Sequence, residues 1–297
     1  MNSIIIQHMS NNITILQKYF NPTHFNVQET SPGLLLVYSN DNAVHPCLEL
    51  LIHRNFMKVE YVNKCNDRIS GTQLLNIVSK FAKENGTINT IELQDTSKLP
   101  KLCYRYDFPL YIIYILSTGK SWYNTYGYKS TNYVNEVRHN ARLLNMPMDE
   151  FILQCNSLRF YPQDEEELRE MMEEFYGVMN QHKFYKISKN RTRLNPQMTV
   201  KETFTRLKKY LLKNMPPMKK SNGEQNEFCY VLKWLMDLID TSNIILYDSS
   251  KLLLTVSRPY SGKNRSYKIN SSRRRTTPIT KTYKSKSNHN SRRIYSI

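Results

Sequence analysis

Two short segments hold the residues most able to do chemistry, and the first lies where a strand gives way to a helix. Phe56–Val62 alternates like a strand, and after a polar loop the run Arg68-Ile69-Ser70-Gly71-Thr72-Gln73 opens a helical pattern. The free N–H groups and positive dipole end of a helix N-terminus attract anions, and a glycine lets a phosphate approach the backbone. This segment is therefore a candidate site for a phosphate-bearing ligand. The alternative is that Gly71 eases a turn and Arg68 is a solvated charge.

The second segment is rich in aromatic residues and lies about 50 residues further along the chain. It reads Ser121-Trp122-Tyr123-Asn124-Thr125-Tyr126-Gly127-Tyr128 and follows a predicted helix that Gly119 closes. A tyrosine hydroxyl can donate a proton in a reaction. Such clusters also serve as ordinary core aromatics, and that alternative stays open at this point.

Together the two segments resemble motifs of the GNAT superfamily of acyl-CoA-dependent N-acetyltransferases. The family's strand-to-helix junction carries Arg/Gln-x-x-Gly-x-Gly/Ala, whose backbone holds the pyrophosphate of coenzyme A. Arg68-x-x-Gly71-x-Gln73 is similar to it and departs from it at Gln73. A later segment of the family reads Phe-Tyr-x-x-x-Gly-Phe, to which Tyr123 and the following Gly127-Tyr128 are similar. The resemblance covers roughly residues 13–130.

The resemblance implies a GNAT-like mixed sheet with flanking helices, with acetyl-CoA as co-substrate and an amine as acceptor. The sequence does not identify the amine. It implies that Arg68, Ser70, Gly71 and Thr72 hold the cofactor and that Tyr123 protonates the departing thiolate. No metal is implied.

Acetyl transfer to an amine also requires a base, and the central strand offers Glu60. An exposed strand position explains that glutamate as well. A different function keeps the fold without the reaction: a catalytically inactive scaffold that acts as a binding or virion-associated protein. Cys65 precedes the helix in the same loop, but an incidental thiol is the simpler interpretation. His53 and His139 lack a visible partner and receive no role.

Hydrophobic periodicity predicts the elements that position these residues. Strands are expected at Leu34–Tyr38, Cys47–His53, Phe56–Val62 and Thr87–Leu93, with an antiparallel hairpin formed by the middle two. Helices are expected at Asn12–Phe20, Gly71–Asn85, Leu110–Thr118, Asp164–Met179 and Glu227–Ile239, and another after a Thr199/Glu202 capping box. Asn243–Leu246 and Leu252–Val256 are expected to form a closing hairpin.

The fold class is therefore α/β (α+β), in three parts. We expect a GNAT-like domain over residues 1–132, a mainly helical companion region over 133–256 and a disordered basic tail over 257–297. The net charge of +17 is concentrated in the tail, which has twelve Lys and Arg residues and no acidic residue. A segment of this composition does not fold alone and binds polyanions, so nonspecific nucleic-acid binding is expected there. A nuclear import signal or a merely solvating tail are the alternatives.

The spacing of the cysteines and the hydropathy of the chain indicate the cellular compartment. Five widely spaced cysteines form neither a zinc motif nor an even disulfide framework, so reduced thiols are expected. No apolar run reaches the ~20 residues of a membrane span, so no membrane partner is expected. The expected location is intracellular, in the cytoplasm or nucleus of a host or in a virion. The abundance of Asn, Ile, Lys and Tyr suggests a large DNA virus as the source.

Overall fold

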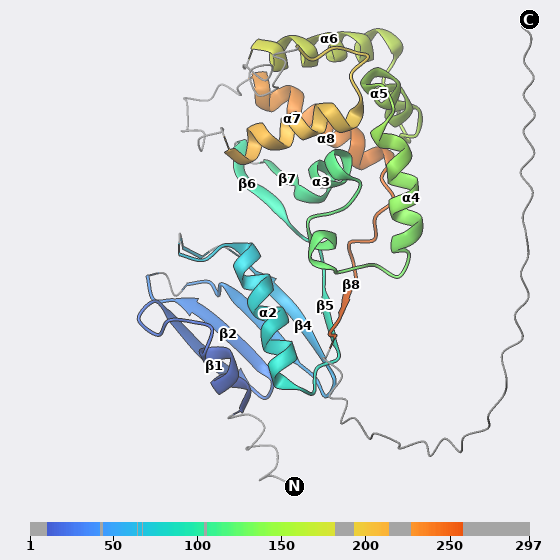
Figure 1. Cartoon of the computed structure of the whole chain (residues 1–297). Coiled ribbons are helices and arrows are strands. Elements are labelled where there is room, and N and C mark those ends of the chain that lie inside the picture. The colour runs from blue at the N-terminus through green and yellow to red at the C-terminus, as the bar shows by residue number, and fades with distance from the viewer. Residues whose placement is uncertain are drawn as a thin grey trace, which may run out of the picture. The chain divides into compact units, whose positions relative to one another are not determined.

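A computed structural model describes residues 11–41, 44–63, 65–66, 68–103, 106–181, 193–213 and 227–257. The chain divides into two compact units, Met1–Arg258 and Pro259–Ile297, and all described residues belong to the first (Figure 1). The expected disorder of the tail concerns residues that lie, except Ser257, outside these ranges. The first unit combines helices with a mixed sheet, so the predicted α/β class is confirmed.

A six-stranded mixed sheet has the strand order β1-β2-β3-β4-β5-β8. β1 to β4 are antiparallel neighbours, β4 and β5 run parallel, and β8 is antiparallel to β5. A parallel pair needs a crossover connection, which α2 supplies here. The strands are β1 (Phe25–Ser31), β2 (Leu34–Ser39), β3 (Leu48–Ile52), β4 (Phe56–Val62), β5 (Thr90–Leu93) and β8 (Leu252–Thr255), and α2 is Gly71–Asn85.

Strand β4 changes its surroundings midway along its length. β3 and β4 form the predicted antiparallel hairpin, but the register skips Glu60, whose neighbours Val59 and Tyr61 face consecutive residues of β3. Glu60 is therefore the extra residue of a β-bulge, which bends a strand and interrupts its ladder. The pairing of β4 with β5 ends at Val59 and Leu93, whereas β4 continues to Val62. The pairing stops because β5 itself ends at Leu93, so β4 extends past its parallel partner next to the bulge.

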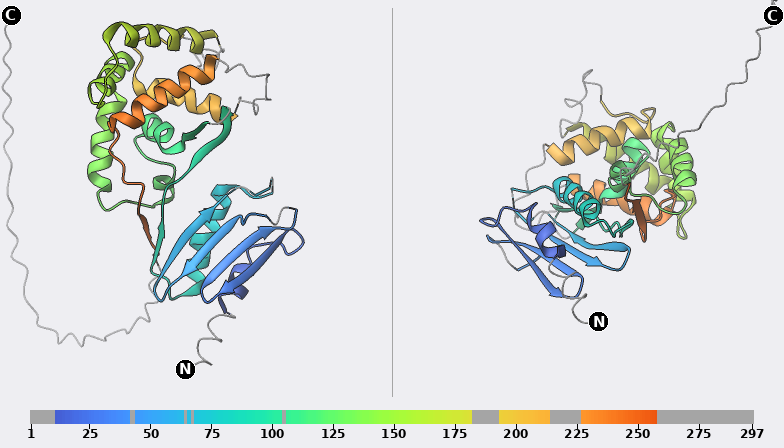
Figure 2. Two further views of the ribbon diagram at one scale, coloured as in Figure 1. Left: turned by 180° about the vertical axis from the view of Figure 1, so that it is seen from behind. Right: turned by 60° about the horizontal axis from the view of Figure 1, so that its bottom comes forward.

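Helix α2 lies across one face of this sheet, as the opposite views of Figures 1 and 2 show. Its predicted apolar stripe is buried against alternate residues of the strands; the helical members are Leu74, Leu75, Val78, Phe81 and Ala82. Gly86 closes the helix with a φ of 76°, the left-handed C-cap expected from the sequence. A short helix over residues 11–17 packs beside the end of α2, where the Tyr19 hydroxyl donates to Glu84.

The remaining described elements form a second hydrophobic core. They are β6 (Lys98–Cys103), β7 (Tyr106–Pro109), α3 (Leu110–Thr118), α4 (Tyr133–Leu144), α5 (Met148–Ser157), α6 (Glu165–Gln181), α7 (Val200–Lys213) and α8 (Glu227–Ser242), with a 3₁₀ turn, η1 (Tyr123–Tyr126), between α3 and α4. The predicted helical character after residue 132 is confirmed, and so are the bounds of α3. No helix in the described part of the chain combines the length and the apolar character that crossing a membrane requires.

Each of the two cores contains residues from both sides of residue 132. The core of the sheet includes Tyr123 and Tyr128 of the aromatic segment and Leu252 and Val256 around β8, whereas the second core begins at Cys103. The chain therefore leaves the sheet after β5 and returns to it twice. The boundary between the two folded parts remains a prediction.

Two expectations are wrong. Asn243–Leu246 forms no strand, and β8 pairs with β5 instead of closing a hairpin, because local alternation identifies a strand but not its partner. The thiols are not all reduced: Cys47 is bonded to Cys65 and Cys103 to Cys229, which leaves a buried Cys155 free. The sequence separations of these pairs, 18 and 126 residues, match no short motif.

Candidate functional site

The N-terminus of α2 is closed by its own side chains. The Ser70 hydroxyl accepts the Gln73 N–H at 3.2 Å, and the Gln73 side-chain oxygen accepts the Ser70 N–H at 2.8 Å. These two hydrogen bonds form a reciprocal capping box. They occupy two backbone N–H groups that would otherwise be free to bind an anion. Gln73, the residue that departs from the family pattern, is thus an exposed cap of the helix.

The aromatic segment lies directly on this first turn. A Cβ placed on Gly71 would lie 3.2 Å from Cη2 of Trp122, so the indole ring occupies the space in front of the glycine. The Thr72 and Tyr126 hydroxyls are 2.7 Å apart and share a hydrogen bond. The structure therefore brings together the two segments that the sequence singled out. It does so with Trp122 where a ligand would approach the backbone.

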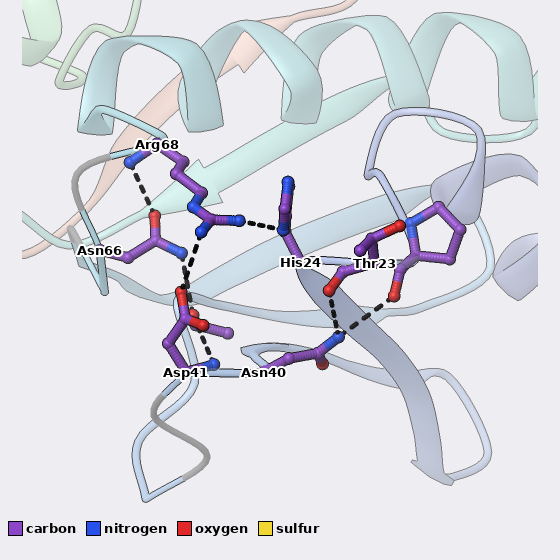
Figure 3. A network of polar contacts seen from close by, with 8 residues as sticks. Thr23, His24, Asn40, Asp41, Asn66 and Arg68 are labelled. Atoms are coloured by element: carbon purple, nitrogen blue, oxygen red, sulfur yellow. Dashed lines mark hydrogen bonds and ion pairs between the residues drawn. The ribbon is translucent and has the colours of Figure 1, made fainter.

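Arg68 lies near this turn but its side chain is engaged elsewhere. Figure 3 shows its guanidinium directed toward the ring of His24 and the carboxylate of Asp41, which is 3.9 Å away. Its own N–H donates to Asn66, and the Asn66 amide donates to Ser39 in turn. These contacts fix the loop before α2 against the first two strands. Arg68 is half-exposed and does not reach over Gly71 in this arrangement.

Tyr123 is buried between other aromatic rings. Its ring is 4.9 Å from Trp122 and 6.2 Å from Tyr128, and 7% of its surface is exposed. Burial, with a smaller contribution from the negative charge of Asp95, raises the pKa of Tyr123 well above 10. The hydroxyl is thus held protonated, as a proton donor must be. The burial of Tyr123 also agrees with the alternative interpretation, in which it is an ordinary core aromatic.

Sequence reasoning missed the most connected polar group of this region, Asp95, which follows β5. One carboxylate oxygen accepts the Tyr247 hydroxyl at 2.6 Å, and the other accepts the N–H of Ser97 at 3.0 Å. The Ser121 hydroxyl is 3.0 Å from Tyr247, which ties the network to the start of the aromatic segment. The Asp-Thr-Ser turn after a strand was a signal for Asp95, but nothing in the sequence pointed to its partner 152 residues away.

Glu60, the candidate base, is exposed and forms an ion pair with Lys58 at 2.8 Å. The hydrogen bond with Glu60 is the main cause that raises the pKa of Lys58. Both side chains are about one-third exposed, so the interaction is a surface pair. The structure therefore places Glu60 at the bulge, just beyond the end of the β4–β5 pairing, with its carboxylate already paired with Lys58.

The site offers hydroxyl, carboxylate and aromatic groups and no metal ligand set. In the described ranges no group of three His, Cys, Asp or Glu side chains is arranged to hold a metal ion. Ligands in open α/β sheets bind outside the carboxyl ends of parallel strands, but here the capping box closes the N-terminus of α2 and Trp122 covers Gly71. Comparison of the chain with family models, with curated proteins and with solved structures gave no match.

Proposed function

We propose that this protein is a GNAT-type acyl-CoA-dependent N-acetyltransferase that acts on an amine. The observation that carries the proposal is that β4 runs on past the end of its parallel partner β5, whose pairing stops at Val59 and Leu93, before the chain turns into α2. The bulge at Glu60 interrupts the β3–β4 ladder at the same point, and in the proposal a backbone N–H of β4 polarises the acyl carbonyl there. The motif resemblance at Arg68, Gly71 and Tyr123 supports the same reaction.

In the proposed reaction, Trp122 moves off Gly71, and acetyl-CoA enters with its pyrophosphate at Ser70, Gly71 and Thr72 and its thioester beside the end of β4. The acceptor amine gives up a proton to Glu60 and attacks the carbonyl carbon. The C–S bond then breaks, the sulfur leaves as a thiolate, and Tyr123 supplies its proton. Tyr123 carries this proton at neutral pH, and because burial raises its pKa, transfer to the thiolate requires stabilisation of the phenolate in the complex.

Binding of acetyl-CoA to the full-length protein tests this proposal, with Trp122 as the reporter. The chain has two tryptophans, so in a Trp234→Phe variant the fluorescence comes from the residue that covers Gly71. We expect acetyl-CoA to change this emission with a midpoint between about 1 μM and 1 mM. ATP is the control for nonspecific attraction to the basic tail. No change up to millimolar acetyl-CoA, or an equal change with ATP, would contradict the proposal.

A second candidate is the inactive scaffold, a binding or virion-associated protein. It is favoured by one specific observation: the indole of Trp122 fills the approach to Gly71 while Arg68 is engaged by His24 and Asp41. Absence of acetyl-CoA binding in the experiment above is the result that this candidate predicts. An intracellular location stays a proposal, but the two disulfides remove the reduced thiols on which it was based. In either case we also propose nonspecific nucleic-acid binding through residues 257–297. The second point is tested by a salt titration of DNA binding with and without those residues.

A further inference from the structure

The connection between α5 and α6 carries an unusual concentration of exposed apolar side chains. Phe160 and Tyr161 are 86% and 78% exposed, and Leu153 and Leu158 are a little over half exposed. The two aromatic rings contact each other edge to face, with centroids 4.6 Å apart. Single exposed apolar residues are normal in proteins, but four within nine residues form a patch.

This connection is held in place by buried hydrogen bonds. The Asn156 amide donates to the Gln163 carbonyl and accepts the Gln163 N–H, both at 2.9 Å. The Gln163 side chain accepts the indole N–H of Trp234 on α8 at 3.0 Å. Because both ends of the turn are fixed, Phe160 and Tyr161 are presented in a set conformation. Presenting aromatic rings in this way lowers the entropy cost of binding a partner.

The helix that follows the patch is strongly acidic. From Asp164 to Glu174 seven acidic side chains and one arginine give a formal charge of −6, and every one of these acidic residues is exposed. None of them forms an ion pair with a cation in the described ranges. The helix dipole favours acidic residues in the first turn only. Glu170, Glu173 and Glu174 lie beyond it, and Glu166, Glu170 and Glu174 repel one another at i, i+4 spacing.

We propose that Leu153, Leu158, Phe160 and Tyr161, with the acidic face of α6, form a docking surface for a cationic amphipathic segment of a partner protein. The aromatic pair would anchor the apolar side of that segment, and the glutamates would pair with its Lys and Arg residues. A nucleic acid would be repelled by the same charge, as would an anionic membrane. The proposal is independent of acyl transfer, because none of these residues lies at the site beside α2.

The test uses the full-length protein and two labelled peptides of equal charge. One is an amphipathic leucine–lysine helix, and the other replaces its leucines by serine. We expect the leucine–lysine peptide to bind at least about 10-fold more tightly, and Phe160→Ser/Tyr161→Ser to remove at least about 10-fold of that affinity. Glu170→Gln/Glu173→Gln/Glu174→Gln should weaken binding at low salt and flatten its salt dependence. Val134→Ser, which removes a 68% exposed apolar side chain on α4, is the matched control and should bind as the wild type does.

Equal binding of the two peptides, or full affinity of the aromatic variant, would overturn the proposal. Two other occupants are tested with the same variant. Sedimentation that shows a dimer lost on Phe160→Ser/Tyr161→Ser would assign the patch to a second copy of this chain. Binding to phosphatidylserine vesicles that the same variant abolishes would assign it to a membrane. Either result would also overturn the proposal of a cationic partner segment.

Discussion

The hydroxyl of Tyr247 donates a 2.6 Å hydrogen bond to the carboxylate of Asp95, although 152 residues separate the two. Asp95 stands at the end of β5, and Tyr247 lies in the segment that leads into β8. The contact therefore joins the point where the chain leaves the sheet to the point where it returns. Through the hydroxyl of Ser121 it also reaches the aromatic segment that carries Tyr123.

Removing this hydrogen bond should destabilise the protein by about 1.5–3 kcal/mol, the usual value for a buried hydrogen bond to a charged group. The variant is Tyr247→Phe, and the measurement is urea unfolding of the full-length protein. In an Asp95→Asn background the same change should cost less, because the acceptor is then neutral. Tyr161→Phe, on the exposed patch, is the control and should cost less than about 0.5 kcal/mol. Equal costs in both backgrounds would show that the pair is not coupled.

Stability should fall steeply above about pH 10, because several tyrosines bind their protons more tightly in the folded state. Burial is the main cause that raises the pKa of these residues above the ordinary value of 10.0, and they are Tyr111, Tyr123, Tyr128, Tyr176 and Tyr247. A raised pKa contributes stability that is fully present below pH 10 and lost above it. Absorbance at 295 nm should show these phenols ionising only as the protein unfolds. Their ionisation in a still folded protein, judged by circular dichroism, would contradict this.

The elements with strong local signals were predicted from the sequence. The β3–β4 hairpin follows from two alternating runs separated by two residues, and α2 and α3 follow from their apolar patterns and closing glycines. The partner of β8 and the Cys103–Cys229 disulfide could not be predicted, because they join residues far apart in the chain. The Cys47–Cys65 disulfide closes the predicted β3–β4 hairpin, but its spacing of 18 residues matches no short motif. β1 was missed because Phe25–Ser31 has only two buried residues among polar ones.

The candidate site was predicted in its composition but not in its arrangement. The sequence singled out Gly71 and Tyr123, and the structure places their segments together. It could not show that Trp122 would lie on the glycine or that Arg68 would turn toward His24, because rotamers and loop contacts depend on the tertiary packing. Asp95 was missed because its hydrogen-bond partner Tyr247 lies 152 residues away in the chain.

The contact of Trp122 with Gly71 makes a prediction about helix stability. Alanine is better than glycine in a helix by about 0.5–1 kcal/mol, and α2 begins at this residue. Gly71→Ala should show that gain only in a Trp122→Leu background, because in the wild type the new methyl group meets the indole at 3.2 Å. Thermal unfolding of the two backgrounds measures the difference. A full gain with Trp122 present would show that the indole moves away freely.

The disulfides predict a defined thiol count. Without reductant the denatured protein should take up one alkyl group, at Cys155, and after reduction five. The native protein should take up none, because burial raises the pKa of Cys155 to about 12. Replacing Cys103 and Cys229 by alanine should cost about 5 kcal/mol, and Cys47 and Cys65 about 3 kcal/mol, because the longer loop restricts the unfolded chain more. Intact-mass spectrometry checks the number of alkyl groups, and urea unfolding checks the two stability costs. Five alkyl groups added without reductant would refute the pairing.

The polar face of α4 holds the segment that returns to the sheet. Asn140 accepts the N–H of Leu246 at 3.1 Å and donates to its carbonyl at 2.9 Å, and Glu136 accepts the N–H of Asp248 at 3.0 Å. His139, which received no role from the sequence, contacts the carbonyl of Ile244 at 2.8 Å. These contacts explain why Asn243–Leu246 does not form the predicted strand: its backbone is bonded to side chains of a helix.

Asn140→Ala should therefore destabilise the protein by about 2–3 kcal/mol, because two backbone groups beside a side chain that is 2% exposed lose their partners. Hydrogen exchange should show that Leu246 loses protection, and β8 should follow because the same segment delivers it to β5. Asn135→Ala is the matched control on the same helix: its amide is exposed and contacts only Asn132 among described residues, so a cost below about 0.5 kcal/mol is expected. If Asn140→Ala left the exchange of β8 unchanged, the return of the chain to the sheet would be held by the strand pairing alone.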